Sequence, residues 1–359
     1  MITLAEFKIL TQLLKNKFQT QREIAEDLNM SLGKVNSVIS ELKNKDLING
    51  NNAITNVGLV ELEPYKVNNA VILAAGMSTR FAPLSYEKPK GLLNVKGEIL
   101  IERQIKQLHS VGIKDITLVV GYMKEKMFYL EEKYGVEIVV NEDYYRYNNT
   151  SSMMLVANKL SNTYICSSDN YFEKNPFEKY VYKGYYSSIY EEGETDEYCI
   201  SFDKKDRIID AKVGGCNSWV MLGHVYFDRE FSNKFSSILR EEYKKQAVKE
   251  GLWEDLYIRF ISELDLRIRR YSRNIIREFD SLDELREFDK DYLKNTNSRI
   301  LNNISNILEC REEEIEQISP IKAGLTNTSF KFTVSGKQYV YRHPGKGTED
   351  YINRKSEAA

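Results

Sequence analysis

An apolar run that ends in small residues and is followed by two basic side chains is the part of this sequence best suited to bind phosphate. Residues 71–76 read Val-Ile-Leu-Ala-Ala-Gly, and Arg80 and Lys90 follow. Apolar and β-branched residues that stop at a glycine predict a buried strand opening into a tight loop. Small side chains let backbone N–H groups approach a phosphate chain, and the basic groups neutralise its charge. The chemistry expected here is nucleotide handling.

A carboxylate at the end of a second apolar run is the first candidate for a metal ligand. Residues 163–168 predict a strand, and Asp169 follows it directly. A carboxylate at such a strand end, beside a phosphate loop, can hold Mg²⁺ against a nucleotide's α-phosphate. A second carboxylate is expected from the start of a later helix, where the sequence leaves Glu254 and Asp255 as alternatives.

The segments that would position these groups alternate between strand and helix. After the opening strand, helices are predicted at 99–110 and 124–134 and strands at 116–120 and 136–140. Helical runs between strands imply right-handed crossovers and a mostly parallel α/β sheet with both faces covered. Ligands of such sheets lie beyond the carboxyl ends of the strands. We therefore expect the loop after residue 73, Tyr122 and Asp169 to converge on one crevice.

The opening stretch resembles the signature of the sugar-phosphate nucleotidyltransferase superfamily. Ser78 stands where that family usually has a second glycine. The resemblance implies a Rossmann-like, mostly parallel sheet and Mg²⁺-dependent nucleotidyl transfer. It also implies that Lys90 steadies the attacking phosphate and Arg80 the departing pyrophosphate. The residues that match are Leu73, Ala74, Ala75, Gly76, Arg80, Pro89 and Lys90.

A narrower resemblance, to the bacterial phosphocholine cytidylyltransferases, covers residues 67 to about 290. It depends on Asn149 and Ser152 after Tyr147, and on Trp253 followed by two carboxylates. It implies CTP and phosphocholine as substrates, and CDP-choline as a product that serves cell-surface or lipid decoration. Aromatic faces hold trimethylammonium groups. The implied nucleotide contacts include Tyr122, Asn149 and Ser152, and the implied choline contacts are Tyr190, Tyr198 and Trp253.

Two other functions remain open at this point. A sugar-1-phosphate nucleotidyltransferase would need hydrogen-bonding side chains where an aromatic cage is expected. A transcriptional regulator whose α/β domain only senses a nucleotide would have no need of Lys90 and Asp169 together. The reaction class and the acceptor therefore require separate tests.

Two smaller modules flank the central domain, which we expect at 67–295. Residues 1–66 resemble a winged helix-turn-helix, but up to Tyr65 they carry seven Lys and Arg against eight Asp and Glu, so DNA binding is possible but not favoured. Residues 296–359 resemble the N-terminal lobe of choline kinases, with Arg342 and Glu357 in its phosphate-binding roles. Because no catalytic loop follows, we expect a truncated kinase lobe. The composition of the chain changes at both boundaries, which predicts that residues 67–295 would fold and be active without the flanking modules.

Composition excludes several classes of protein. The net charge of −2 gives no overall attraction to nucleic acid or membrane. Four cysteines without C-x-x-C spacing suggest neither a zinc site nor a disulfide framework. No long apolar run or signal sequence is present, so a cytoplasmic enzyme is expected. The sequence leaves the oligomeric state open, a homo-oligomer included.

Overall fold

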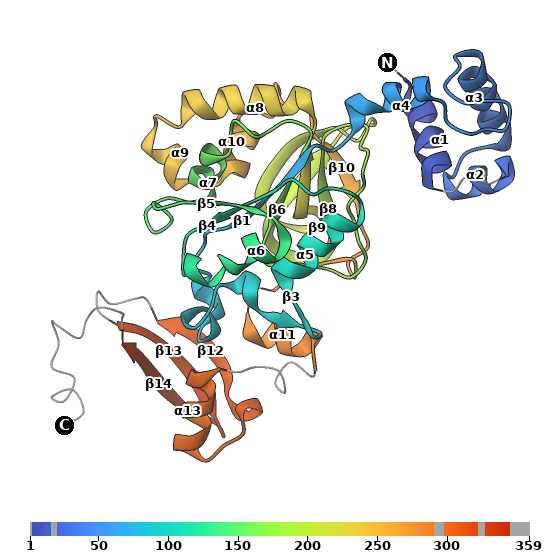
Figure 1. Cartoon of the computed structure of the whole chain (residues 1–359). Coiled ribbons are helices and arrows are strands. Elements are labelled where there is room, and N and C mark those ends of the chain that lie inside the picture. Colours follow the sequence, from blue (N-terminus) through green and yellow to red (C-terminus); the bar gives the residue numbers. More distant parts are fainter. Residues whose placement is uncertain (1, 16–19, 280, 291–297, 322–326, 345–359) are drawn as a thin grey trace.

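The computed structural model of the chain describes residues 2–15, 20–279, 281–290, 298–321 and 327–344. It has a helical N-terminal module, a central α/β domain and a small C-terminal sheet, shown from blue to red in Figure 1. No helix among the described residues is long and apolar enough to cross a membrane.

The N-terminal module begins with the helices that the sequence predicts. Thr20 and Glu23 form a capping box, and the Ser31 hydroxyl accepts a hydrogen bond from the Lys34 N–H. These caps start two helices because they satisfy N–H groups that have no partner within the helix. A single bridge between Ile48 and Ile54 closes a short wing. The helices are α1 (Leu4–Lys15), α2 (Gln21–Asp27), α3 (Leu32–Asn44) and α4 (Asn56–Leu62).

The central domain is built on a seven-stranded sheet in the order β10-β8-β9-β6-β1-β4-β5. β1 runs parallel to β4 and β6, and β4 to β5, which confirms the mostly parallel α/β sheet. The sequence did not reveal the long antiparallel hairpin of β8 and β9. The strands are β1 (Asn69–Ala74), β4 (Ile116–Val120), β5 (Glu137–Val140), β6 (Thr163–Ser167), β8 (Tyr185–Phe202), β9 (Ile208–Phe227) and β10 (Arg267–Arg270).

Helices cover both faces of this sheet (Figure 1). Alternation along β1 sends Ile72 into the core beneath α5 (Leu100–Ser110) and α6 (Tyr129–Tyr134), and Val71 into the opposite core. The predicted helix at 124–134 is interrupted, since η5 (Lys124–Lys126) precedes α6. The opposite face carries α7 (Asn149–Leu155), α8 (Arg229–Glu242), α9 (Gln246–Glu250) and α10 (Trp253–Arg259).

Short segments at the carboxyl ends of the strands surround residues 75–78, which follow β1 and are called the signature loop below. They are the 3₁₀ turns η2 (Thr79–Phe81), η3 (Leu84–Tyr86) and η4 (Lys90–Leu92) and the small strands β2 (Asn94–Val95), β3 (Glu98–Ile99), β7 (Asn170–Phe172) and β11 (Ile276–Glu278). Another 3₁₀ turn, η1 (Glu63–Tyr65), leads from the N-terminal module into the central domain.

The C-terminal elements form a three-stranded antiparallel sheet in the order β12-β13-β14. Arg342 lies on β14, whereas Glu357 is outside the described residues. The elements are α11 (Leu282–Phe288), α13 (Arg299–Leu308), η6 (Glu312–Glu314), β12 (Glu316–Ile321), β13 (Asn327–Val334) and β14 (Lys337–Pro344).

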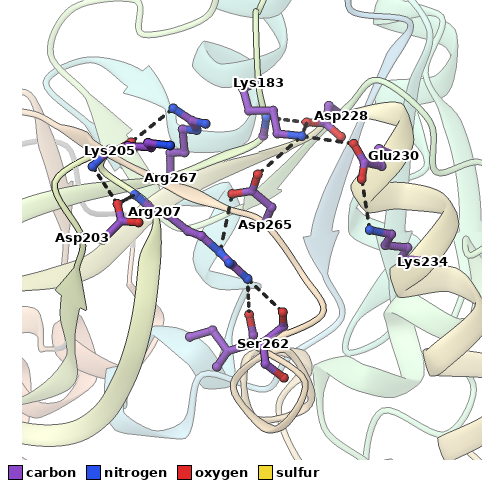
Figure 2. A network of polar contacts seen from close by, with 12 residues as sticks. Lys183, Asp203, Lys205, Arg207, Asp228, Glu230, Lys234, Ser262, Asp265 and Arg267 are labelled. Carbon is purple, nitrogen blue, oxygen red and sulfur yellow. Dashed lines mark hydrogen bonds and ion pairs between the residues drawn. The ribbon is translucent and has the colours of Figure 1, made fainter.

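An ion-pair network fastens the α8–α10 layer to the edge of the sheet (Figure 2). Lys183 before β8 lies 3.5 Å from Asp228 and 3.6 Å from Asp265. The Arg207 guanidinium on the other side donates to the Ser262 carbonyl at 2.9 Å. Asp228 also caps α8 by accepting from the Phe231 N–H. Asp265 therefore has a structural role, because it pairs with Lys183 at the edge of the sheet.

Gln104 of α5 holds the chain on both sides of Asp169. Its amide nitrogen donates to the carbonyls of Ser167 and Asn170, each at 2.8 Å, and the side chain is 1% exposed. A buried donor shared between these two carbonyls fixes the turn that carries the Asp169 carboxylate.

Loss of these two hydrogen bonds from Gln104 should lower the stability of the chain measurably. Gln104→Met should lower the free energy of unfolding by about 1–3 kcal/mol, because two carbonyls lose a buried donor. Gln107→Met is the matched control: Gln107 donates only to the Phe172 carbonyl, which keeps Arg103 as a donor. Urea unfolding of both variants measures the difference, and equal losses would contradict this role of Gln104.

Candidate active site

A cavity of about 800 Å³ opens at the carboxyl ends of the parallel strands. The signature loop, the end of β6, the start of α7, the β8–β9 hairpin and the start of α10 all contribute to its wall. Of the predicted residues, those lining it are Leu73, Ala75, Gly76, Arg80, Lys90, Asn149, Ser152, Asp169, Tyr198, Trp253 and Glu254.

The Lys90 and Asp169 side chains form a largely buried ion pair on this wall. Their Nζ and Oδ2 atoms are 2.9 Å apart, with exposed fractions of 8% and 18%. Burial alone would raise the pKa of Asp169, but the charge of Lys90 and a hydrogen bond from Ser167 hold that pKa below its ordinary value. The Asp169 carboxylate is therefore charged at neutral pH, and the charge of Lys90 beside it offsets the loss of water.

A close backbone approach makes this ion pair possible. A Cβ on Gly91 would lie 2.9 Å from the Cβ of Ser168, so only glycine lets η4 pack this tightly against the end of β6. Gly91 was not among the predicted site residues. The residue follows Pro89-Lys90 directly, and that position was the available signal.

The signature loop bends through a strained residue. Ser78 has φ 47° and ψ 47°, in the left-handed region that favours glycine. This geometry agrees with the glycine that the family resemblance implies at this position. An added Cβ on Gly76 would meet no atom within 4 Å, so Gly76 leaves the loop backbone open to a ligand. Arg80 is exposed on the cavity wall, whereas Ala74 points into the core.

Tyr122 holds the loop and does not line the cavity. Its hydroxyl donates to the Ser85 carbonyl at 2.8 Å, and its N–H donates to the Ala75 carbonyl at 3.1 Å. A supporting role therefore fits this geometry better than the direct nucleotide contact that the resemblance implied.

Asn149 connects the start of α7 to the start of α10. Its side-chain oxygen accepts from the Trp253 N–H at 2.8 Å, and its amide nitrogen donates to the Glu254 carboxylate at 3.2 Å. Ser152 is buried, and its hydroxyl accepts from Asn141 at 3.0 Å. The predicted Asn149 and Ser152 positions thus organise two helix ends around the cavity.

The Glu254 carboxylate lies in a partly apolar part of the cavity. The Tyr186 hydroxyl donates to it at 3.3 Å. Burial raises the pKa of Glu254 to about 7, against the lowering effect of the hydrogen bonds from Asn149 and Tyr186. A carboxylate beside aromatic rings is well placed to meet a cationic ligand group.

The other predicted second carboxylate, Asp255, serves the helix. It accepts from the Leu252 N–H at 3.1 Å and from the Tyr198 hydroxyl at 2.6 Å. Asp255 is exposed and is not among the described residues that line the cavity. Its place therefore fits a cap for α10 and a support for Tyr198 better than a metal ligand.

The three aromatic residues predicted for choline differ in position. Trp253 is 2% exposed, with its ring stacked on Tyr186 at 5.9 Å. Tyr198 lines the cavity. Tyr190 is 41% exposed, its ring contacts the Trp219 ring, and it is not among the described residues of the cavity wall. Tyr186, which the sequence analysis missed, takes the place expected for Tyr190.

The carboxylates suit a metal that is completed by a nucleotide. The described residues include no group of three or more His, Cys, Asp or Glu that could hold a metal alone. Mg²⁺ usually binds through one or two carboxylates together with substrate phosphates. Asp169 fits this pattern. Glu278, also missed from the sequence, lines the same wall and accepts from the Asn170 amide at 3.2 Å.

Comparisons with known proteins agree with this architecture. Residues 70–171 match the MobA-like NTP transferase domain, and residues 3–49 match a winged helix-turn-helix DNA-binding family. These two matches cover the signature loop with Asp169 and the N-terminal helices. The resemblance of residues 296–359 to a kinase lobe remains a prediction.

Full-length relatives narrow the assignment. Choline-phosphate cytidylyltransferase of Streptococcus pneumoniae is 36% identical over 232 residues, which cover 64% of this chain and 99% of that relative. 2-Aminoethylphosphonate cytidylyltransferase of Lancefieldella rimae is 34% identical over 229 residues, or 63% of this chain and 93% of that relative.

A solved structure agrees with these sequence relatives. The structure of CTP:phosphocholine cytidylyltransferase from Streptococcus pneumoniae matches with a TM-score of 0.60 and 35% identity over 62% of this chain and 97% of that one. The chain belongs to the nucleotidyltransferase family that includes the choline-phosphate cytidylyltransferases, and it is a cytidylyltransferase with an N-terminal winged helix-turn-helix.

Proposed function

We propose that this chain transfers CMP from CTP to phosphocholine, giving CDP-choline and pyrophosphate. The observation that carries the proposal is the Glu254 carboxylate. It is held by Tyr186 and Asn149 in the same cavity as the Lys90–Asp169 pair. One part of the cavity suits phosphates, and another suits a cationic head group. CDP-choline would then serve the decoration of a cell surface or of lipids.

The residues around the phosphates position and neutralise them. The phosphocholine oxygen would attack the α-phosphorus of CTP in line, so no general base is required, because the nucleophile is already an anion. Lys90 would stabilise the charge that develops on the transferred phosphoryl group, and Arg80 would neutralise the departing pyrophosphate. Asp169, with Glu278 as a second carboxylate on that wall, would hold Mg²⁺, which supplies further charge stabilisation at the phosphates.

The other part of the cavity would select the acceptor. A trimethylammonium group has no hydrogen to donate, and it is stabilised by aromatic faces and a nearby anion at about 0.5–2 kcal/mol per contact. Tyr186, Tyr198 and Glu254 supply these groups, with Glu197 on the same wall. A sugar phosphate would instead bring hydroxyl groups that require partners.

A second acceptor is favoured by the relative from Lancefieldella rimae, whose name gives 2-aminoethylphosphonate as its substrate. A primary ammonium could donate hydrogen bonds to Glu254 and Glu197, both of which line the cavity. The two candidate functions share the reaction and differ only in the cationic end of the acceptor.

DNA is the partner that the family match of the N-terminal module suggests, although the module's charge does not favour DNA binding. The exposed residues of α3 include Glu41 as well as Lys34. An acidic group on that helix opposes approach to phosphates.

A pair of carboxylate variants tests the reaction centre. Asp169→Asn should lower kcat by about a hundredfold or more, because a charge that stabilises the transition state is lost. Asp255→Asn keeps one acceptor oxygen for the Leu252 N–H of the α10 cap, and its amide NH2 can donate to the Tyr198 hydroxyl, so kcat should change by less than about threefold. Pyrophosphate release with saturating CTP measures both. A large loss of kcat in Asp255→Asn together with an active Asp169→Asn would show that Asp255, and not Asp169, acts in the reaction.

Lys90→Met provides a second test of the phosphate side. Because the Lys90 charge is assigned to the transition state, kcat should fall more than the affinity for CTP. Lys124→Met is the control, since Lys124 pairs with Glu142 on the surface and does not line the cavity. A raised KM for CTP with unchanged kcat would assign Lys90 to binding alone.

The pKa of Glu254 predicts how acceptor binding depends on pH. With a pKa of about 7 in the free chain, Glu254 loses its charge as the pH falls below 7. The KM for phosphocholine should therefore rise about tenfold between about pH 8 and pH 6, beyond the change caused by the substrate phosphate itself. Glu254→Gln removes this additional step and shows the substrate's own contribution.

Acceptor panels decide between the candidate functions. CTP is offered with phosphocholine, 2-aminoethylphosphonate or glucose 1-phosphate. The proposal predicts the highest kcat/KM for phosphocholine, lowered about two- to thirtyfold by Tyr186→Ala or Tyr198→Ala. A preference for 2-aminoethylphosphonate would support the second function. Efficient turnover of glucose 1-phosphate, unaffected by both substitutions, would overturn both acceptor assignments.

A further inference from the structure

The C-terminal sheet packs against the segment that carries Arg80 and Lys90. We infer that α13 and β12–β14 act as a positioning unit for this segment, so that their packing sets how well the chain uses CTP. The inference rests on the proposed roles of Arg80 and Lys90 in phosphate binding. Figure 1 shows β12 and β13 directly beneath the turns between β1 and β3.

A shared hydrophobic core joins the two parts. One buried cluster contains side chains from both parts. Phe81 and Leu84 come from residues 79–92, and Ile300 and Phe330 come from the C-terminal elements. Each of these four side chains is at most 3% exposed. The Tyr86 ring meets the Phe330 ring at 6.1 Å. Because side chains from both parts share one buried cluster, each part contributes apolar surface that covers the other.

Polar contacts fix the relative position of the two parts. The Glu87 carboxylate accepts from the Ile300 N–H at 3.1 Å, so a side chain of the loop helps to cap α13. Ser298 caps the same helix from its own side, through the Leu301 N–H at 3.1 Å. Arg286 of α11 donates to the carbonyls of Ile315 and Glu312 at 2.7 and 3.1 Å.

This contact reaches the reaction centre through Phe81. The Phe81 ring lies under the Lys90 ammonium, with 5.4 Å between Nζ and the ring centroid. Phe81 therefore packs against the C-terminal elements and also supports the lysine assigned to the transition state. Displacements of about 1 Å at such groups can cost on the order of a hundredfold in rate. The sequence expectation that residues 67–295 would work alone conflicts with this packing.

The two caps of α13 provide a matched test in the full chain. Glu87→Ala removes the cap that comes from the loop, Glu87→Gln keeps an acceptor there, and Ser298→Ala removes the helix's own cap. Glu87→Ala should lower kcat/KM for CTP by about tenfold, with Glu87→Gln within about twofold of the wild type. Ser298→Ala should lower the melting temperature by about as much as Glu87→Ala does, because each variant loses one cap of α13. It should leave kcat/KM for CTP within about twofold of the wild type.

Hydrogen exchange supplies a readout that needs no turnover. In the ligand-free chain, exchange at residues 79–92 should accelerate in Glu87→Ala and Phe330→Ala, and not in Ser298→Ala. Phe7→Ala is the control for loss of a buried ring, because Phe7 belongs to the separate core of the N-terminal module and its ring contacts Tyr65 and Tyr182.

The outcomes separate the two proposals. Unchanged exchange at residues 79–92, with unchanged kcat/KM in the variants of Glu87 and Phe330, would overturn the positioning role. A wild type that uses CTP with none of the acceptors would overturn the proposed function. Even then, the exchange rates at residues 79–92 would test whether the C-terminal elements hold this segment in place.

Discussion

The buried Lys90–Asp169 pair is the interaction on which the rest of the site depends. Two charges leave water together, and each remains acceptable only while the other stays within hydrogen-bond distance. The structure holds both sides of the pair. Gly91 lets η4 approach the end of β6, and Gln104 fixes the turn around Asp169. The Phe81 ring supports Lys90 from below. In the proposed reaction, charge would thus be placed in advance where CTP brings its phosphates, which would reduce the cost of reorganisation during transfer.

The acceptor side follows a different physical rule. Glu254 is kept in a partly apolar place where its pKa rises, so its charge is costly until a cation arrives. Tyr186 and Asn149 orient the carboxylate, and Trp253 serves mainly as packing behind Tyr186. A cationic acceptor would therefore gain more here than a neutral one.

Local patterns predicted the parallel part of the sheet and the strand ends that meet at the cavity. The continuous apolar run of β1, the glycine after it and Asp169 at the end of β6 are all set by neighbours in the sequence, so their positions could be derived from spacing. The acceptor side depends on the long β8–β9 hairpin, whose pairing brings Tyr186 near α10 across many residues. No local signal separated Tyr186 from Tyr190, or Glu254 from Asp255. The shared core of Phe81 and Phe330 was equally invisible, because composition breaks mark boundaries along the chain and not contacts across them.

The central claim is that one cavity holds phosphates at Lys90 and a cationic head group at Glu254. A crystal structure of the chain with CDP-choline and Mg²⁺ tests it most directly, through the distances from the choline nitrogen to Glu254 and to the Tyr186 ring. The prediction is a nitrogen within about 6 Å of the Tyr186 centroid, with the diphosphate between Arg80 and Lys90. A choline group in solvent or at Tyr190, with Glu254 bound to the metal, would contradict it.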